Sequence, residues 1–286
     1  YVQTADGPLP VGGTLSPSLV DFMPAPLTLL MKLMTKKPPK NAEILHQYTT
    51  AIPIGTAIAQ SFDTDFAALC GDIVGDEMER TGVKLWLAPA LNIHRDIRCG
   101  RNFEYYSEDP FVSGKIAAAI TKAVQAHKNC GVTIKHYAAN NQETNRYASN
   151  GHVSERAMRE IYLKGFEICV READPKAVMT SYNLLNGTHT SEHRGLVWDI
   201  LRCEFGYRGI VMTDWIIPGL LAPNTKYGEP DPARVAASSN DIFMPGSKKE
   251  RDRIMEEMKD GTVDREQVER NVTRLVRMAI NLSGRQ

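Results

Sequence analysis

The amino-acid sequence predicts an α/β protein, most simply a (β/α)8 barrel of the TIM type that is irregular or incomplete at its N-terminus. Short apolar runs that end in polar or charged residues alternate with helical stretches along the 286 residues. This alternation is typical of parallel strands joined by helices, which either close into a barrel or form a doubly wound sheet. The chain has no Walker motif, and no Gly-x-Gly-x-x-Gly follows its first strand, so the nucleotide-binding open sheet is disfavoured.

Each expected element rests on its own pattern. Apolar runs rich in β-branched residues predict strands at 2–5, 82–89, 131–136, 177–183, 209–213 and 241–246. Apolar residues spaced three to four apart predict helices at 65–80, 112–128, 196–205 and 264–282, and one that begins at Ser154, a good N-cap residue. The expected buried face of the Ser154 helix comprises Met158, Ile161, Tyr162, Phe166 and Cys169. That of the last helix comprises Val268, Val272, Leu275 and Val276.

The whole chain, residues 1–286, is expected to form one barrel domain. Residues 17–41 mix Pro, Met, Leu and Lys, which is typical of an insertion or a partner-facing arm. Residues 216–238 follow the 209–213 strand and contain four prolines between 218 and 232, which predicts an active-site loop. The chain opens within an expected strand, which suggests that it is a piece of something longer.

Composition restricts the classes of partner. The chain is 42% hydrophobic, and its 34 Lys+Arg balance its 34 Asp+Glu, so neither a nucleic acid nor an anionic membrane is expected as the main target. The five cysteines are dispersed, which favours reduced thiols and a cytoplasmic location. No run approaches 18 apolar residues, so no membrane span is expected. No His, Cys or carboxylate set has ligand spacing, so we expect neither a metal nor an organic cofactor.

Charged and hydrogen-bonding residues collect at the ends of the expected strands, where the catalytic groups of barrels lie. Taken singly, each has another explanation: Asp214 as a helix cap, Lys135 as a Schiff-base lysine, and His136 as a structural donor. Arginines in these loops could equally form surface ion pairs. As a ring, they suit a polyol, because charged groups bind vicinal hydroxyls and an indole stacks on a sugar face. The ring comprises Asp6, Arg101, Lys135, His136, Arg146, Met179, Tyr182, Asp214 and Trp215.

An ordered set of six motifs then gives a specific resemblance. They are DGP at 6–8, RDIRCGRNFEYYSEDP at 95–110, KHYAANNQETNR at 135–146, MTSYNLLNG at 179–187, TDW at 213–215 and NDIFMPG at 240–246. Over nearly its whole length the chain resembles the N-terminal barrel domain of the family 3 glycoside hydrolases, in their β-glucosidase-like branch, as a domain-permuted member or a fragment. The family's other, N-acetylglucosaminidase branch has a His/Asp dyad in a Gly-rich loop after Lys-His, whereas this chain has Ala138-Ala139-Asn140.

The resemblance implies a retaining, exo-acting β-glycosidase, with Asp214 as the nucleophile that forms a glycosyl-enzyme intermediate. It implies that Asp6, Arg101, Lys135, His136, Arg146 and Tyr182 bind the sugar hydroxyls of subsite −1, and that Met179 and Trp215 line it. If Lys135 and Arg146 lie near Asp214, their charge would hold its pKa down. One departure concerns Gly12, because the family has a sugar-contacting Arg near this position.

The general acid/base is the largest gap. In the glucosidase-type branch this Glu comes from an α/β sandwich domain, which this chain does not contain. We therefore expect it from another domain or a partner subunit, with Glu104, Glu108 and Glu143 as weaker local candidates. The expected substrate is a β-linked glucoside or oligosaccharide. Three alternatives stay open: a Schiff-base aldolase that uses Lys135, a sugar-binding barrel without turnover, and a β-xylosidase-type specificity.

Overall fold

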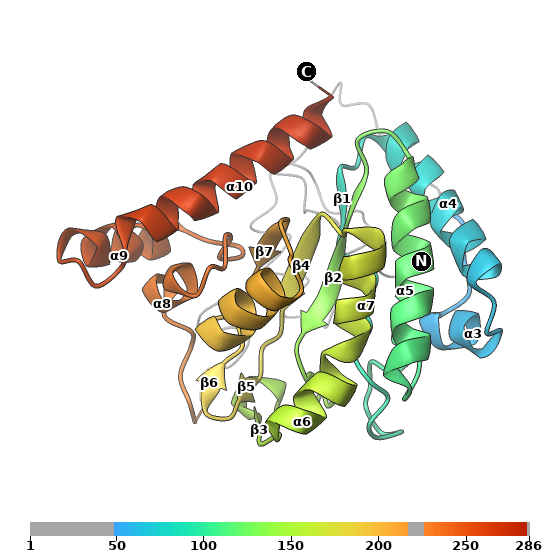
Figure 1. The fold of residues 1–286 in the computed structure, drawn as a ribbon, viewed down its shortest axis with the longest axis horizontal. Helices are drawn as coiled ribbons and strands as arrows, with labels where there is room; N and C mark the ends of the chain where they lie inside the picture. Colours follow the sequence, from blue (N-terminus) through green and yellow to red (C-terminus); the bar gives the residue numbers. More distant parts are fainter. Residues whose placement is uncertain (1–48, 217–225, 285–286) are drawn as a thin grey trace, which may run out of the picture. The chain divides into compact units, whose positions relative to one another are not determined.

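The computed structural model describes residues 49–216 and 226–284, and Figure 1 shows their arrangement. The chain divides into two compact units, Tyr1–Thr50 and Ala51–Gln286, and the second contains all the elements described here. The expected strand at 2–5, Asp6, Gly12 and the 17–41 arm lie outside the described residues. The single-domain assignment therefore stays a prediction.

A four-stranded parallel sheet forms the centre of this unit and confirms the predicted α/β class. Its order is β1 (Leu85–Trp86), β2 (Gly131–Tyr137), β4 (Ala177–Thr180) and β7 (Ile210–Met212). Every neighbouring pair is parallel. The expected strand at 241–246 is reduced to one parallel bridge, between Met212 and Ile242. Among the described residues the sheet thus consists of four parallel strands, extended by this one bridge.

The register of this sheet brings together the strand ends that carry the predicted site residues. Lys135 pairs with Met179, and Met179 pairs with Met212. In-register residues of parallel strands share one face. On this face Ala177, Met179, Ile210 and Met212 form a buried apolar cluster. Because Asp214 lies two residues after Met212, it follows the same row of side chains beyond the strand end.

Helices α4 (Thr64–Thr81), α5 (Pro110–Ala126) and α7 (Lys164–Ala173) form a layer beside the sheet, with α5 between the other two (Figure 1). Two of them begin at aspartate caps: the Asp63 and Asp109 carboxylates each accept two backbone N–H bonds of the first turn. Helices α5 and α7 approach closely at Gly114, where a Cβ would lie 2.8 Å from the Ile168 side chain. Tyr137 of β2 packs edge-on against Phe166 of α7, with ring centroids 5.1 Å apart.

The helix predicted from Ser154 is divided into three parts. They are α6 (Glu155–Ala157), the π-helical η3 (Met158–Tyr162) and α7. Ser154 is its N-cap as predicted, because its side chain accepts the Ala157 N–H. The predicted face is wrong at Ile161, which is 39% exposed. A π turn advances by more residues than an α turn, so it rotates Ile161 away from the core. The helix η4 (Gly195–Glu204) is also a π-helix.

The C-terminal helices differ from expectation in two places. A short helix, α8 (Pro232–Ala237), occupies part of the predicted 216–238 loop, and Asp231 caps it. Helices α9 (Lys248–Lys259) and α10 (Arg265–Ser283) follow. Two of the four residues on the predicted apolar face of α10 are exposed, Val272 at 50% and Val276 at 52%. In contrast, Gln267 and Asn271 are buried. These two amides bond to each other, and Asn271 donates to the Ala236 and Asn240 carbonyls, which explains why a polar face points inward.

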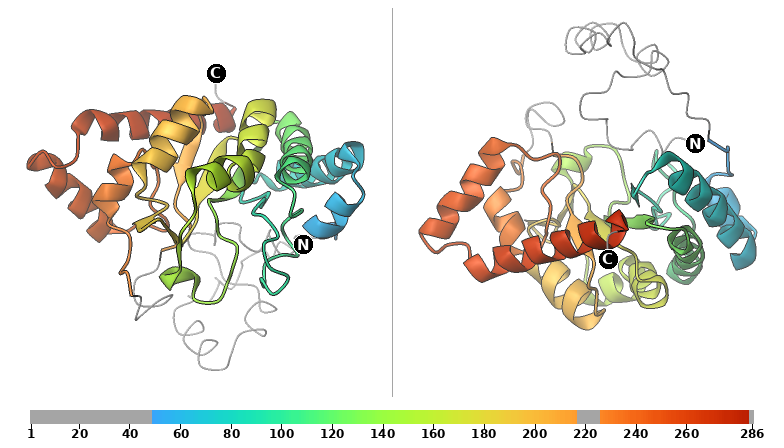
Figure 2. Two further views of the ribbon diagram at one scale, coloured as in Figure 1. Left: turned by 60° about the horizontal axis from the view of Figure 1, so that its bottom comes forward. Right: turned by 90° about the horizontal axis from the view of Figure 1, so that it is seen from above.

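Smaller elements complete the unit. A second sheet of β3 (Asn150–Gly151), β5 (Leu184–Leu185) and β6 (Thr188–His189) lies near the carboxyl ends of the parallel strands, whereas α10 lies at their beginnings (Figures 1 and 2). Helix α3 (Gly55–Gln60) precedes α4, and a 3-10 turn, η2 (Arg146–Ala148), precedes β3. All five cysteines are free thiols. Within 49–216 and 226–284, no helix is both long and apolar enough to cross a bilayer.

Candidate active site

Asp214 lies just past the end of β7, and hydrogen bonds with residues 242–244 hold the backbone on both sides of it. The Thr213 N–H donates to the Ile242 carbonyl (2.9 Å), and the Ile216 N–H donates to the Met244 carbonyl (2.8 Å). In return, the Met244 N–H donates to the Thr213 hydroxyl oxygen (2.8 Å). Pairing with 242–244 therefore continues beyond the strand and fixes the direction of the Asp214 side chain. Asp214 is only 8% exposed.

The two carboxylate oxygens of Asp214 have different surroundings. Its Oδ1 accepts the N–H of Trp215 at 2.7 Å. Its Oδ2 is buried and accepts no hydrogen bond from any described residue. The nearby Tyr182 hydroxyl donates instead to the Trp215 carbonyl oxygen (2.8 Å). A buried carboxylate oxygen without a donor is costly and uncommon, so it marks a position that a ligand can fill.

The end of β2 brings Lys135 and His136 to Asp214. Asn92 holds this strand end: its Nδ2 donates to the His136 carbonyl (2.8 Å), and its Oδ1 accepts the His136 N–H (2.8 Å). His136 Nδ1 also lies 3.2 Å from Asn92 Oδ1. This orients the ring, whose Nε2 is 3.6 Å from Asp214 Oδ2. Burial, followed by the charges of Arg101, Lys135 and Arg146, lowers the pKa of His136 well below its ordinary value, so the ring is neutral at pH 7.

Arg101 is one of the two cations that act on Asp214. It forms an ion pair with Glu104, whose carboxylate also lies 4.0 Å from the Lys135 ammonium. Burial works to lower the pKa of Arg101, but its interactions with Tyr105, Glu104 and Asp214 outweigh burial and raise that pKa. Lys135 is 2% exposed. The site thus contains two cations and two carboxylates in a small, largely buried volume.

Arg146 belongs to a second group beside the first. Its Nη1 donates to Glu143 at 2.6 Å, and its guanidinium lies over the rings of Tyr147 and Tyr182, 5.0 and 4.8 Å from their centroids. Glu143 also accepts a bond from Asn140 Nδ2 (3.1 Å). Through Tyr182, this cation–aromatic stack reaches the Trp215 backbone next to Asp214.

The pKa of Asp214 differs from the expectation. Nearby cations were expected to hold its pKa down, but burial is the largest influence and raises the pKa of Asp214 above its ordinary value. The Trp215 N–H, Lys135, Arg101 and Tyr182 all act in the opposite direction, in that order. The net direction is therefore upward because desolvation outweighs the cations.

The structure brings most of the predicted site residues together. Arg101, Lys135, His136 and Tyr182 all interact electrostatically with Asp214 or flank it. Trp215 is partly exposed beside it. Met179 is 2% exposed and packs in the apolar cluster with Met212, on the row that leads to Asp214. Asp6 lies outside the described residues. The roles of these residues toward a sugar remain predictions.

The three local acid/base candidates differ in their contacts. Glu104 is bound to Arg101 and lies close to Lys135. Glu143 is bound to Arg146. Both carboxyl groups are thus engaged in ion pairs within the protein. Glu108 is exposed and contacts the Ser107 hydroxyl at 3.2 Å.

Sequence reasoning missed two participants. Asn92 was not singled out, although it is a polar residue directly after an apolar run, and such residues at strand ends are the signal that selected Lys135. Glu104 was considered only as an acid, not as the partner of two cations. Both interact with residues distant in sequence: 44 positions separate Asn92 from His136. Local patterns do not reveal such pairs.

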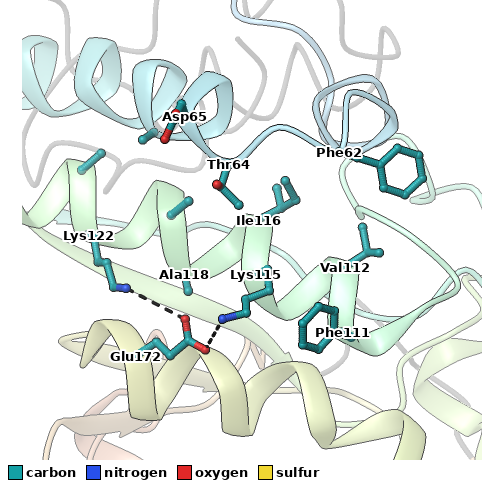
Figure 3. Close-up of a pocket in the computed structure, with 13 residues that line it drawn as sticks. Phe62, Thr64, Asp65, Phe111, Val112, Lys115, Ile116, Ala118, Lys122 and Glu172 are labelled. Atoms are coloured by element: carbon teal, nitrogen blue, oxygen red, sulfur yellow. Dashed lines mark hydrogen bonds and ion pairs between the residues drawn. The ribbon is translucent and has the colours of Figure 1, made fainter.

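The cavity shown in Figure 3 is separate from this site. It encloses about 760 Å³ on α4 and α5, and its lining includes Phe62, Phe111 and Lys115. Its charged groups neutralise one another, since Glu172 pairs with Lys115 (2.7 Å) and Lys122 (3.9 Å). None of the predicted site residues lines it. In the part of the chain that the structure describes, no cluster of His, Cys, Asp and Glu could hold a metal ion.

Comparison with known proteins gives this site its family context. Residues 41–278 match the model of the glycosyl hydrolase family 3 N-terminal domain. A β-glucosidase B from Emericella nidulans is 42% identical over 78% of this chain, and an exo-α-(1→6)-L-arabinopyranosidase from Bifidobacterium longum is 41% identical over 58%. The structure of β-glucosidase 3B from Thermotoga neapolitana in complex with glucose is similar, with a TM-score of 0.77 and 40% identity over 86% of this chain.

These relatives are longer proteins. The chain spans 26% of the Emericella nidulans protein, 22% of the Bifidobacterium longum protein and 34% of the Thermotoga neapolitana chain. The matched part agrees with the parallel α/β architecture. From the family match over most of its residues and the agreement in fold, this chain belongs to glycosyl hydrolase family 3, as its N-terminal domain.

Proposed function

We propose that this chain is the barrel domain of a retaining, exo-acting β-glucosidase, in which Asp214 forms a covalent glycosyl-enzyme intermediate. The observation that supports this most directly is the unbonded Oδ2 of Asp214, buried beside Arg101 and Lys135 at a strand end. A retaining glycosidase needs a carboxylate oxygen directed at the anomeric carbon. An oxygen already occupied by a protein donor would be a weaker nucleophile.

The surrounding residues suit a sugar in subsite −1. Lys135, Arg101 and Arg146 are donors, and a neutral His136 offers one donor or acceptor at Nε2. Tyr182 and the partly exposed Trp215 add polar and apolar contacts. Asp6, predicted from the sequence, would complete the ring of hydroxyl ligands. The substrate would be a β-linked glucoside or oligosaccharide, as the printed activity of the Emericella nidulans relative suggests.

The general acid/base would come from outside this chain. Two of the three local candidates, Glu104 and Glu143, are held by cations. The chain also spans only about a quarter of its β-glucosidase relative. We therefore propose that a further domain, or a partner subunit, supplies the second carboxyl group and completes the site.

The aldolase alternative loses support from the surroundings of Lys135. Schiff-base formation needs a neutral amine, and the Glu104 carboxylate at 4.0 Å favours the protonated one. A second glycosidase specificity remains a candidate, because the Bifidobacterium longum relative is an arabinopyranosidase and a pentopyranoside lacks only the exocyclic carbon. A sugar-binding barrel without turnover is the third candidate, supported by the cation-bound state of Glu104 and Glu143.

The first experiment uses 2,4-dinitrophenyl 2-deoxy-2-fluoro-β-glucoside, whose leaving group departs without protonation. Intact mass after incubation should increase by one fluoroglucosyl group, and peptide mapping should place it on Asp214. The matched xyloside tests the pentoside candidate in parallel, and the Asp214→Asn variant is the control. A label on another residue would contradict the assignment of Asp214. Glucose binding without any label would support the sugar-binding barrel.

A further inference from the structure

Glu104 is a charged residue of this site that has no role in the proposed function. Its side chain is 7% exposed, and it lies between Arg101 and Lys135. The Arg101 side chain is 18% exposed and that of Lys135 is 3% exposed, so neither cation is surrounded by water. An anion between two desolvated cations screens their mutual repulsion, which is large in a medium of low dielectric constant.

The backbone of Glu104 is fixed independently of these charges. Helix α3 holds the loop: the Thr56 hydroxyl donates to the Asn102 carbonyl (2.7 Å) and to the Tyr105 carbonyl (3.1 Å). Gly55 allows the close approach, because a Cβ there would lie 2.5 Å from the Glu104 carbonyl oxygen. Tyr105, the next residue, is fully buried. Glu104 is therefore a rigid anchor, whereas Lys135 and Arg101 are long side chains with many conformers.

Both cations act on Asp214, and both lie beside the same anion. Lys135 and Arg101 are the two charged side chains that work to lower the pKa of Asp214. The other groups that face Asp214 are His136, which is neutral, the Tyr182 hydroxyl and the Trp215 N–H. Without Glu104, repulsion would separate the two cations and change both their positions and the charge around the carboxylate.

We propose that Glu104 is a positioning residue: it holds Arg101 and Lys135 in the geometry that receives the sugar beside Asp214. This inference rests on the proposed glycosidase function and assigns a second group of the same site. Glu104 acts through the two cations and does not exchange a proton with the substrate.

The test compares Glu104→Gln, Glu104→Asp and wild type in their reaction with the fluoroglucoside. The inactivation rate constant kinact and the concentration KI for half-maximal rate are measured between pH 4 and 8. The Glu104→Gln variant should lose about 100-fold in kinact/KI, the size of effect expected when a binding group moves by about 1 Å. Its acid limb should shift to higher pH, because cations that have moved away stabilise the Asp214 carboxylate less, whereas loss of the negative charge alone would shift the limb to lower pH. Glu104→Asp should keep the wild-type acid limb and recover part of the rate.

Glu256→Gln is the matched control, since Glu256 is exposed on α9 and lies outside the candidate site. It should label like wild type. A Glu104→Gln variant that labels with unchanged kinact/KI and an unchanged acid limb would overturn the inference. If Glu104→Gln does not fold, the Glu104→Asp variant is the test. Unchanged KI and kinact in this variant would show that the length of the side chain at position 104 does not matter, and the inference would be wrong.

A second readout separates this inference from the proposed function. If wild type is not labelled, the proposed function fails, and the pKa of Asp214 is then measured by ¹³C NMR of its carboxyl carbon, assigned with Asp214→Asn. A higher pKa of Asp214 in the Glu104→Gln variant would still support control of the two cations by Glu104, because loss of the negative charge alone would lower this pKa. An identical titration in both proteins would exclude it.

Discussion

Asp214 combines burial with two nearby cations, and burial prevails. Its pKa in the folded protein is raised above the ordinary value. A group with a raised folded-state pKa stabilises the fold below its unfolded pKa, and this contribution is lost as the pH rises through the folded pKa. At neutral pH the buried carboxylate therefore lowers the free energy of unfolding. This is the trade between stability and activity that is common at catalytic sites.

The Asp214→Asn substitution should therefore stabilise the protein at pH 7. The amide keeps the shape and can still accept the Trp215 N–H, but it carries no charge to desolvate. We expect a higher Tm than wild type at pH 7, with about 2–4 °C for each kcal/mol in a unit of this size. The difference should shrink as the pH falls through the raised pKa of Asp214, because the wild-type carboxyl then becomes neutral. Differential scanning calorimetry across this range measures it.

The opposite sign would also be informative. A lower Tm of Asp214→Asn at pH 7 would mean that Lys135 and Arg101 stabilise the carboxylate by more than burial costs. The corresponding control is Asp72→Asn on α4, an exposed carboxylate that should show a small effect of pH on the difference.

The candidate site shows what local sequence can and cannot predict about single residues. Lys135, His136 and Asp214 were identified because each follows an apolar run, and strand ends of a parallel sheet converge. The raised pKa of Asp214 was not foreseen, because desolvation depends on what the whole fold places around a group. The link between Glu104 and Lys135 was also hidden, since it joins a loop to a strand distant in sequence.

At the scale of elements, a buried ionic network joins η4, the turn after α8 and α10. The Asp241 side chain is fully buried and bonds to Arg202 (2.7 Å) and Arg274 (2.9 Å). It also accepts the Val211 N–H of β7 at 2.7 Å. Arg202 donates in addition to the Gly209 and Ser239 carbonyls. One carboxylate thus connects two helices to the strand that leads to Asp214.

The Asp241→Ala substitution should destabilise the protein strongly. It leaves two guanidinium groups and a strand N–H without their buried acceptor, and removal of one partner from a buried ionic network costs about 3–5 kcal/mol. Urea unfolding measures the change. The control is Glu269→Ala, which removes an exposed ion pair with Arg265 on α10 and should cost at most about 0.5 kcal/mol. Equal effects of the two substitutions would show that the buried network contributes little.

Helices were predicted better in position than in orientation. The starts of α4 and α5 follow from aspartate caps, which are local signals. The rotation of Ile161 depends on a π turn, which no apolar spacing announces. In α10, Val272 and Val276 fit an amphipathic pattern, yet the inward face is set by Asn271, which donates to the Ala236 carbonyl, and by Arg274, which donates to the Ser239 hydroxyl. Hydrogen-bonded packing of this kind does not appear as hydrophobic periodicity.

At the scale of the whole molecule, the dependence of rate on leaving group tests the proposed origin of the acid. The kcat/KM values are compared for aryl β-glucosides whose phenols become progressively less acidic. Without a general acid, kcat/KM should fall steeply along the series, and the loss for poor leaving groups should reach about 10²–10⁴-fold. A flat dependence would mean that a Glu of this chain protonates the leaving group, and Glu108→Gln and Glu143→Gln would then identify it.

The fold class could be predicted because strand–helix alternation encodes parallel pairing directly. Strand length could not, since β1 has two residues where eight were expected, and pairing depends on the neighbouring backbone. The bridge at Ile242 shows the same limit. The apolar run at 241–246 forms hydrogen bonds with the end of β7, but only part of it meets strand geometry.

The long separation between interacting parts of the site has a consequence for the order of folding. Asn92 and His136 are 44 residues apart, and Tyr182 and the Trp215 carbonyl are 33 apart. Helices α4 and α5 can form early from local contacts, but parallel pairing must wait until each crossover closes. On a ribosome, a nascent chain that has not yet emerged through Trp215 would already contain the helical layer and the residues of β1, β2 and β4, and would still lack the bond between Tyr182 and the Trp215 carbonyl that closes the candidate site.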